Sequence, residues 1–348
     1  MNDIRLTQFS PGAGCGCKIA PKDLEEILKN SRSQRVYEEL LVGNDSKDDA
    51  AVFDIGDGKA IISTTDFFTP IVDNPFDFGR VAATNAISDI YAMGGKPIMA
   101  IAILGWPLEK LSADIAGEVI SGARSVCDSA NIPLAGGHSI SSADPIFGLA
   151  VTGIAPVSLI KKNNSATEGC LLFLTKPLGI GLVTTAEKFG VANEEDKEVA
   201  LSLMTTLNTP GMALAAIPEV KSMTDVTGFG LLGHALEMAE GSGLKAVIDY
   251  DKVPRISGVD NYIKQECIPG GTNRNFLSYG HKISPLTKEQ KALLCDPQTS
   301  GGLLIAIEPG GVQKLEELAA EEGFSVTGIG RLERKSGEHF IEDRKSVV

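Results

Sequence analysis

The chain has 348 residues, 43% of them apolar and 22% charged, which is an ordinary globular composition with enough length for two domains. The net charge of −13 argues against a broad nucleic-acid or anionic-membrane surface, although a bound cation could mediate between carboxylates and phosphates. Because the sequence has neither a bilayer-length apolar run nor a signal-peptide pattern at its start, we expect a cytoplasmic protein with no nucleic-acid or membrane partner.

Near the N-terminus, residues 12–18 read Gly-Ala-Gly-Cys-Gly-Cys-Lys. Glycines permit unusual turns, so this segment could wrap around a ligand. A neighbouring ammonium favours the thiolate, which is the nucleophilic form of cysteine, and this singles out Cys15 and Lys18. The alternative is a disordered tail with two incidental cysteines. The other cysteines in apolar or helical surroundings are expected in the core: Cys127, Cys170 and Cys267.

The first half of the chain predicts strands mixed with helices. The expected elements are a helical pattern within 20–41, a hairpin of 51–55 with 60–65, a helix over 74–94, a strand over 98–104, a helix over 112–131 and a strand over 147–154. In the first long helix, Asn85 and Asp89 share a face among apolar neighbours. A buried carboxylate needs a partner, for which a metal ion is one candidate. The alternative is two solvated polar residues.

The stretch Gly136-Gly137-His138-Ser139 follows a short apolar run. Small residues with free amides at a strand end can approach phosphate oxygens, and His138 could add a hydrogen bond. The alternative is a tight turn with one exposed imidazole.

The second half begins with an expected polar linker, 161–165. Asp225 precedes a glycine-rich turn into a helix, which it could simply cap. The other expected elements are a strand over 170–174, two or three helices in 181–217, the helix ending near 241, a strand over 246–250, a loop over 296–302, a strand over 303–307, a helix over 311–322 and a strand over 325–329. The tail after about Leu332 is polar and gives no usable signal.

Four acids stand at element ends or on the buried-looking helix face: Asp49, Asp66, Asp89 and Asp225. Oxygen-rich sites suit magnesium, which usually bridges to phosphates. The sequence has no Walker, Rossmann or protein-kinase signature. If the protein handles ATP, we therefore expect carboxylate-held metal ions and a mobile covering segment.

Seven motifs stand in an order that resembles the selenophosphate synthetase (selenide, water dikinase) family, from about Ile4 to Leu332. The Cys-Gly-Cys-Lys part is specific, and the remainder is similar to the wider superfamily of aminoimidazole ribonucleotide synthetase and thiamine-monophosphate kinase. The motifs are Gly-Ala-Gly-Cys-Gly-Cys-Lys (12–18), Asp-Asp-Ala-Ala-Val (48–52), Thr-Thr-Asp-Phe-Phe (64–68), Asn-Ala-Ile-Ser-Asp (85–89), Gly-Gly-His-Ser (136–139), Met-Thr-Asp-Val-Thr-Gly-Phe-Gly (223–230) and Asp-Pro-Gln-Thr-Ser-Gly-Gly (296–302).

The resemblance implies an α/β (α+β) fold of two domains. The N-terminal domain would be ferredoxin-like and would form a β-barrel shared across a homodimer, and the C-terminal domain would be α/β. The expected division is a flexible glycine-rich segment, 1–48, then domains 49–156 and 157–348. The implied reaction converts ATP, hydrogen selenide and water into selenophosphate, AMP and orthophosphate, which supplies activated selenium for selenocysteine and selenouridine synthesis.

The resemblance also implies roles for individual residues. Cys15 matches the catalytic cysteine, which is selenocysteine in some members, and Lys18 matches the essential lysine; the role of Cys17 is less certain. The implied magnesium ligands are Asp49, Asp89 and Asp225. The implied nucleotide contacts are Lys18, Ser46, Lys47, Asp48, Asp66 and Asp89, together with Gly137, His138 and Ser139 from the other subunit.

Two other functions fit part of the pattern. A superfamily kinase that phosphorylates a small organic molecule and releases ADP would use the acids and glycines but not the two cysteines. A non-enzymatic carrier of selenium or a soft metal would use the cysteines but leave the four aspartates unexplained.

Overall fold

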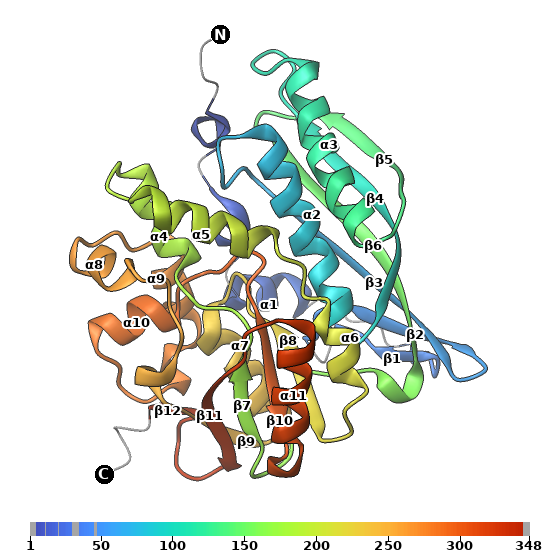
Figure 1. Cartoon of the computed structure of the whole chain (residues 1–348), viewed down its shortest axis with the longest axis vertical. Coiled ribbons are helices and arrows are strands. Elements are labelled where there is room, and N and C mark those ends of the chain that lie inside the picture. The colour runs from blue at the N-terminus through green and yellow to red at the C-terminus, as the bar shows by residue number, and fades with distance from the viewer. Residues whose placement is uncertain (1–4, 11, 20, 30–34, 45–46, 344–348) are drawn as a thin grey trace.

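Figure 1 shows the computed structural model, which describes residues 5–10, 12–19, 21–29, 35–44 and 47–343. Within them the chain forms two six-stranded sheets with helices packed against each. The mixture of strands and helices expected from the sequence is therefore confirmed. No helix in this part of the chain is both long and apolar enough to cross a membrane.

The first sheet has the strand order β1-β2-β3-β6-β4-β5. Neighbouring strands are antiparallel except for the parallel pair β4 and β5. The predicted hairpin of β2 and β3 is confirmed, and its turn uses three consecutive residues with positive φ, Gly56 to Gly58. The strands are β1 (Leu40–Val42), β2 (Ala51–Gly56), β3 (Lys59–Phe68), β4 (Lys96–Trp106), β5 (Leu134–Ser141) and β6 (Ile146–Pro156).

Helices α2 (Pro75–Ala92) and α3 (Ala113–Ser129) pack together beside this sheet (Figure 1). The predicted start of α2 is confirmed, because the Asn74 side chain accepts a hydrogen bond from the Asp77 N–H. A Cβ added to Gly79 would lie 1.8 Å from the carbonyl oxygen of Val119. Glycine is therefore required where the two helix backbones approach each other.

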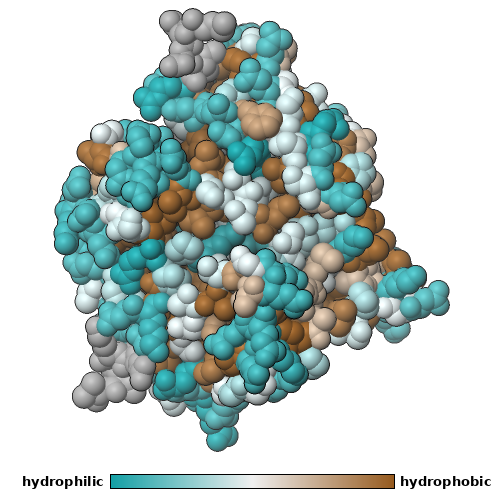
Figure 2. Space-filling view, in the orientation of Figure 1, coloured by the Kyte–Doolittle hydropathy of each residue, from teal (hydrophilic) through white to brown (hydrophobic). Residues whose placement is uncertain are grey.

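The opposite face of the first sheet carries exposed apolar side chains. Cross-strand register aligns Phe53 with Ile61 and Ile154, and Ile101 with Ala150. Figure 2 shows brown, apolar surface along the side of the molecule formed by this sheet. We call this surface the open face and define it by five residues that are 42–60% exposed: Phe53, Phe67, Ile101, Ile140 and Ile154.

The second sheet has the order β12-β9-β11-β7-β10-β8. Its strands are β7 (Leu171–Leu174), β8 (Val220–Asp225), β9 (Leu244–Ile248), β10 (Leu303–Ile307), β11 (Thr327–Arg334) and β12 (Ile341–Asp343). The helices of this half are α4 (Ile180–Lys188), α5 (Glu194–Thr205), α6 (Pro210–Ala215), α7 (Gly230–Gly241), α8 (Val259–Lys264), α9 (Gly270–Tyr279), α10 (Lys288–Leu294) and α11 (Val312–Glu322).

Most of the predicted elements are present, but two short strands were not predicted. The helices α4, α5 and α6 confirm the expected helices of 181–217, and Cys127, Cys170 and Cys267 are buried as predicted. Helix α1 (Pro21–Lys29) confirms the helical pattern predicted from Pro21 to Leu28, and the unpredicted strand β1 follows at Leu40–Val42. The polar tail after Leu332 contains β12, which pairs in parallel with β9 and covers what would otherwise be the edge of the second sheet.

Candidate active site

Helix α2 carries polar side chains into the interior between the two sheets. All its residues from Val81 to Ala92 are buried, because the helix packs on the first sheet and also on β8, α5 and α6. Asn85 is 0% exposed and Asp89 8% exposed, so the alternative of two solvated residues is wrong. Buried polar groups require partners, and those of α2 come from four different parts of the chain.

The short 3₁₀ helix η2 (Gly14–Cys17) holds Cys15 against α2 and the loop 296–302. The Cys15 N–H donates to Thr299 Oγ1 at 3.0 Å, and its thiol donates to Asn85 Oδ1 at 3.1 Å. Arg274 Nη2 donates to the Gly16 carbonyl at 2.7 Å. Residues 12–18 are therefore packed against the protein interior, which is not the disordered tail considered as an alternative.

Glycines are needed for this close packing. Gly14 has φ +49°, and a Cβ there would lie 2.6 Å from Thr299 Oγ1. A Cβ on Gly228, in the turn after β8, would lie 2.6 Å from the carbonyl oxygen of Cys15. Both contacts are shorter than any side chain tolerates, so the glycine pattern serves docking as well as backbone freedom.

Burial governs the protonation of the docked Cys15. Burial raises the pKa of Cys15, and this effect outweighs the lowering by the Lys18 ammonium. A protonated sulfur agrees with its hydrogen bond to the Asn85 carbonyl oxygen. Lys18 therefore favours the thiolate, as expected, but in the docked segment burial has the larger effect because the side chain has left water.

Lys18 reaches the same polar cluster from the other end of η2. Its Nζ donates to Asp66 Oδ2 at 3.0 Å, and the Asn85 amide donates to that same oxygen. Burial lowers the pKa of Lys18, but Asp66, Cys15 and Asp89 raise it by more, so the group stays cationic. Asn85 therefore joins the thiol of Cys15 to the ion pair of Lys18 and Asp66.

Three aspartates lie near this group: Asp89 and Asp225 are buried, and Asp49 is half-buried. Asp49 accepts from Thr224 Oγ1 at 2.7 Å, Asp89 accepts from Thr64, and Asp225 ends β8. Burial raises the pKa of all three carboxyls. Asp225 further raises the pKa of Asp49 and Asp89, so the carboxylates repel one another.

The aspartate cluster is not fully satisfied by the protein. Asp49 Oδ2 and Asp225 Oδ2 are buried and accept no hydrogen bond in the described structure. Helix α7 is capped at Phe229, so Asp225 does not cap it as the alternative proposed. Among the described residues, no three His, Cys, Asp or Glu side chains converge closely enough to hold a metal ion by themselves.

Two of the predicted nucleotide contacts, Lys47 and Asp48, are held by the second half of the chain. Asn163 is 1% exposed; its N–H donates to Asp48 Oδ1 at 2.6 Å and its side chain donates to the Lys47 carbonyl at 2.8 Å. The linker predicted at 161–165 is therefore buried at Asn163, where it binds residues 47 and 48. Ser46 lies outside the described residues.

The residues Gly137, His138 and Ser139 are not brought to this cluster. They lie within β5, the edge strand of the first sheet, and pair with Ala102, Ile103 and Leu104 of β4. Neither the predicted strand end nor the alternative turn is correct. The register puts His138 on the open face, and its side chain is exposed.

Sequence reasoning missed most of the side chains that bind the predicted acids and the cysteine. The motif Asp-Pro-Gln-Thr-Ser-Gly-Gly was predicted as a loop and matched to the family, but no role was assigned to its Thr299 or Ser300. The missed residues are Thr64, Ser88, Thr224 and Thr299. Three further residues support this cluster indirectly: Lys176, Asn208 and Ser300. Hydroxyl and amide residues are common in loops, so their partners follow only from the tertiary packing.

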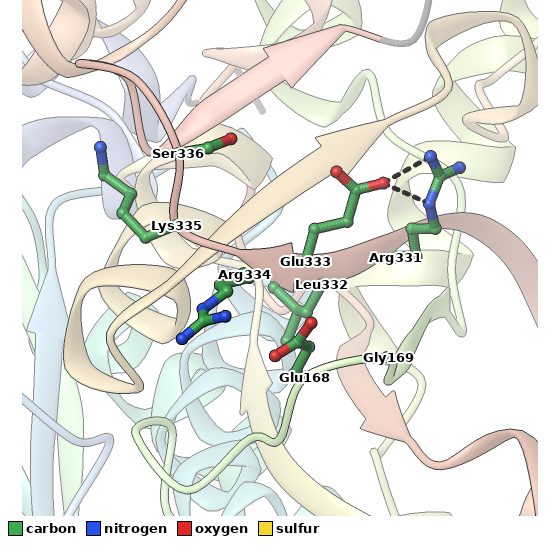
Figure 3. Close-up of a pocket in the computed structure, with 8 residues that line it drawn as sticks. All are labelled: Glu168, Gly169, Arg331, Leu332, Glu333, Arg334, Lys335 and Ser336. Atoms are coloured by element: carbon green, nitrogen blue, oxygen red, sulfur yellow. Dashed lines mark hydrogen bonds and ion pairs between the residues drawn. The ribbon is translucent and has the colours of Figure 1, made fainter.

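The second half of the chain also has a cavity of about 470 Å³. Figure 3 shows the residues that line it. It lies along β11, and its Arg331 and Glu333 side chains pair with each other. None of the acids or cysteines predicted from the sequence lines it. The cavity is therefore separate from the cluster around Cys15.

Two family models match the chain: AIR synthase related protein, N-terminal domain, over residues 47–155, and AIR synthase related protein, C-terminal domain, over residues 167–342. Curated proteins named selenide, water dikinase, from Escherichia coli strain K12 and Shigella boydii serotype 4, are each 58% identical over 344 residues, which covers 99% of both chains. The solved thiamine-monophosphate kinase of Stenotrophomonas maltophilia is 20% identical, covers 94% of this chain and 96% of its own, and has a TM-score of 0.65, a likeness of fold alone.

Proposed function

The chain belongs to the family of selenide, water dikinases within the AIR synthase-related proteins, and from this membership we propose how its residues divide the reaction. The activity is ATP-dependent formation of selenophosphate from selenide and water, with release of AMP and orthophosphate. The observation that carries the site assignment is the docking of Cys15 and Lys18 beside the aspartates Asp49, Asp89 and Asp225.

The aspartates fit magnesium. Two of their oxygens are buried without a hydrogen-bond partner in the described structure. Burial raises the pKa of all three carboxyls, and Asp225 further raises the pKa of the other two. Magnesium typically takes only one or two carboxylates and completes its shell with phosphate oxygens and waters, so three converging side chains are not required. We propose Asp49, Asp89 and Asp225 as the ligands, shared between magnesium ions that each take one or two of the carboxylates. Bound there, the ions would neutralise the charge of the triphosphate.

Lys18 supplies the fixed positive charge at this site. Its ammonium is held by Asp66 in a partly buried position, where an electrostatic contact is stronger than in water. We propose that Lys18 stabilises the negative charge that develops on the γ-phosphate during transfer. Asp66, Lys47 and Asp48 would contact the nucleotide; these assignments rest on the matched motifs.

We propose that Cys15 holds or delivers selenide. Sulfur and selenium are both soft and polarisable. The docked thiol is linked to the Lys18 ammonium by hydrogen bonds through Asn85 and Asp66. The packed segment would exclude water while selenide attacks the γ-phosphorus and ADP leaves. ADP, or a species derived from it, is then hydrolysed to AMP and orthophosphate.

The function is tested by nucleotide analysis under anaerobic conditions. With ATP, magnesium and selenide, the purified protein is expected to release AMP and orthophosphate, and omission of selenide should remove selenophosphate formation. Release of ADP at a rate indifferent to selenide would instead favour a kinase for a small organic substrate. The absence of any nucleotide turnover would favour a selenium or soft-metal carrier.

We also propose that the open face is the homodimer interface. Its five apolar residues are spread over five neighbouring strands, and an exposed apolar surface that is contiguous across a sheet often marks a protein interface. His138 lies on the same face. A partner docked there could carry Gly137, His138 and Ser139 toward the nucleotide, which this chain's own β5 does not do.

Ile101→Glu is expected to disrupt this dimer. Ile101 is 45% exposed in the centre of the open face, and a carboxylate there would be buried without a partner. Sedimentation equilibrium should report a monomer with reduced activity. Leu277→Glu is the matched control, because Leu277 is 80% exposed on α9 in the other half. A dimer that persists in Ile101→Glu at the wild-type concentration dependence would contradict the interface.

The finer fold assignments stay proposals. We keep the division into 1–48, 49–156 and 157–348, with the observation that β1 (Leu40–Val42) already pairs with β2. A ferredoxin-like topology, a shared barrel, flexibility of the N-terminal segment and a cytoplasmic location remain predictions from the sequence.

A further inference from the structure

The loop 296–302 is fixed at its base by helix α4. Asp296 Oδ2 accepts from the Gly181 N–H at 3.0 Å. Gln298 Oε1 accepts from the Gly179 and Ile180 N–H groups at 3.2 and 3.1 Å. These side chains satisfy the free amides at the start of α4, so the beginning of the loop has one defined position.

A buried lysine fixes the middle of the same loop. Lys176 is 6% exposed, and its Nζ donates to the carbonyl oxygens of Ser300, Leu203 and Thr206 at 2.8, 3.2 and 2.7 Å. These three acceptors use all the N–H bonds of an ammonium group. Ser300 itself has φ +51°, a conformation that a serine keeps only where its surroundings hold it.

The loop fixed in this way makes two contacts around Cys15. Thr299 Oγ1 accepts the Cys15 N–H at 3.0 Å. The Ser300 N–H donates at 2.8 Å to Asn85 Oδ1, which is the oxygen that accepts the Cys15 thiol. The loop therefore sets both the backbone of Cys15 and the orientation of the acceptor for its sulfur.

We propose that Thr299 is a positioning residue that docks the segment carrying Cys15, with Ser300 orienting Asn85 to receive the thiol. The catalytic meaning of this docking rests on the role proposed for Cys15. The docking itself can be measured without any turnover.

Removal of the Thr299 hydroxyl should weaken the docked state selectively. Thr299→Val keeps the shape of the side chain but leaves the Cys15 N–H buried without an acceptor. A lost hydrogen bond of this kind shifts a docked–undocked equilibrium by about tenfold. Thr299→Ser retains the hydroxyl and should restore docking.

The test is alkylation of Cys15 by iodoacetamide, followed by peptide mass spectrometry. All variants carry Cys17→Ser, because Cys17 is exposed and would react in the same peptide. We expect Cys15, which is 1% exposed in the docked form, to react about tenfold faster in Thr299→Val than in the parent, in line with the shift in docking. Thr299→Ser should react at the parent rate.

Two references separate docking from general loosening. Cys127 and Cys170 are 0% exposed and should stay unreactive in every variant, because they lie away from the loop. Thr272→Val is the matched substitution, since Thr272 is 0% exposed and its hydroxyl has no hydrogen-bond partner in the described structure. It should leave Cys15 at the parent rate.

The outcomes distinguish the inference from the proposed function. An unchanged Cys15 rate in Thr299→Val, or a parallel rise at Cys127 and Cys170, would overturn the positioning role. Faster Cys15 alkylation in Thr299→Val, restored to the parent rate by Thr299→Ser, would support the docking whatever the turnover, because alkylation reports the undocked fraction. The catalytic role proposed for Cys15 is decided separately, by the selenide-dependent turnover of Cys15→Ser.

Discussion

Asp225→Asn is expected to lower selenide-dependent turnover by about 100-fold or more, since a metal contact at a developing charge is worth several kcal/mol. The same change should stabilise the metal-free protein. Burial and repulsion raise the pKa of Asp49 and Asp89, and Asp225 contributes to both shifts. A neutral amide of the same shape removes this repulsion from the folded state.

The stability measurement is thermal unfolding in EDTA and again in excess magnesium. In EDTA the melting temperature of Asp225→Asn should exceed that of wild type, by on the order of 2 °C for each kcal/mol of relieved repulsion. Magnesium should raise the wild-type melting temperature but have little effect on the variant. A variant that loses stability in EDTA and keeps the full magnesium response would contradict the assignment of Asp225 as a ligand.

Asp196→Asn provides the matched control. Asp196 is also buried, but Tyr262, Ser257 and the Gly258 N–H donate hydrogen bonds to its carboxylate. Loss of an acceptor there should destabilise the protein by about 1–3 kcal/mol. The magnesium response should remain, because Asp196 has no assigned part in the metal site.

Lys18→Met is expected to lower kcat by roughly 10²–10³-fold, the usual cost of removing a fixed charge or donor at a transition state. The substitution keeps the length of the side chain but leaves Asp66 without the ammonium that now lies 3.0 Å away. Steady-state AMP formation measures the loss. Lys221→Met, which removes a partly exposed ion pair with Glu308, should retain wild-type turnover.

Cys15→Ser is the informative comparison with Lys18→Met. It should also lose selenide-dependent turnover, but ATP binding should persist because Lys18 and the aspartates are intact. Isothermal titration with a non-hydrolysable ATP analogue separates the two variants. Full turnover by either variant would remove the role assigned to that residue.

Much of the fold followed from short-range patterns. Alternating apolar residues and the Gly-Asp-Gly turn predicted β2 and β3, and the Asn74-Pro75 pair predicted the start of α2. The strands β1 and β12 escaped prediction because each has three residues and is defined by pairing with a distant strand. Polar composition made residues 161–165 look like a linker, but Asn163 is buried by its contacts with 47–48.

The site was predictable where an acid or a cysteine stood out in its local sequence. Cys15, Lys18, Asp66 and Asp89 were selected in this way, and the structure brings them together around Asn85. The ionisation of Cys15 could not be predicted, because a neighbouring lysine is visible in the sequence and burial is not. Thr299 and Ser300 were hidden for the same reason, since they contact residues more than 200 positions away.

The most direct test of the account is ³¹P and ⁷⁷Se NMR of an anaerobic reaction containing ATP, magnesium and selenide. The account predicts a new phosphorus signal coupled to selenium, formed together with AMP and orthophosphate by the wild-type protein and absent with Cys15→Ser. Phosphorus signals of ADP and orthophosphate alone, unchanged by selenide and equal in the two proteins, would contradict it.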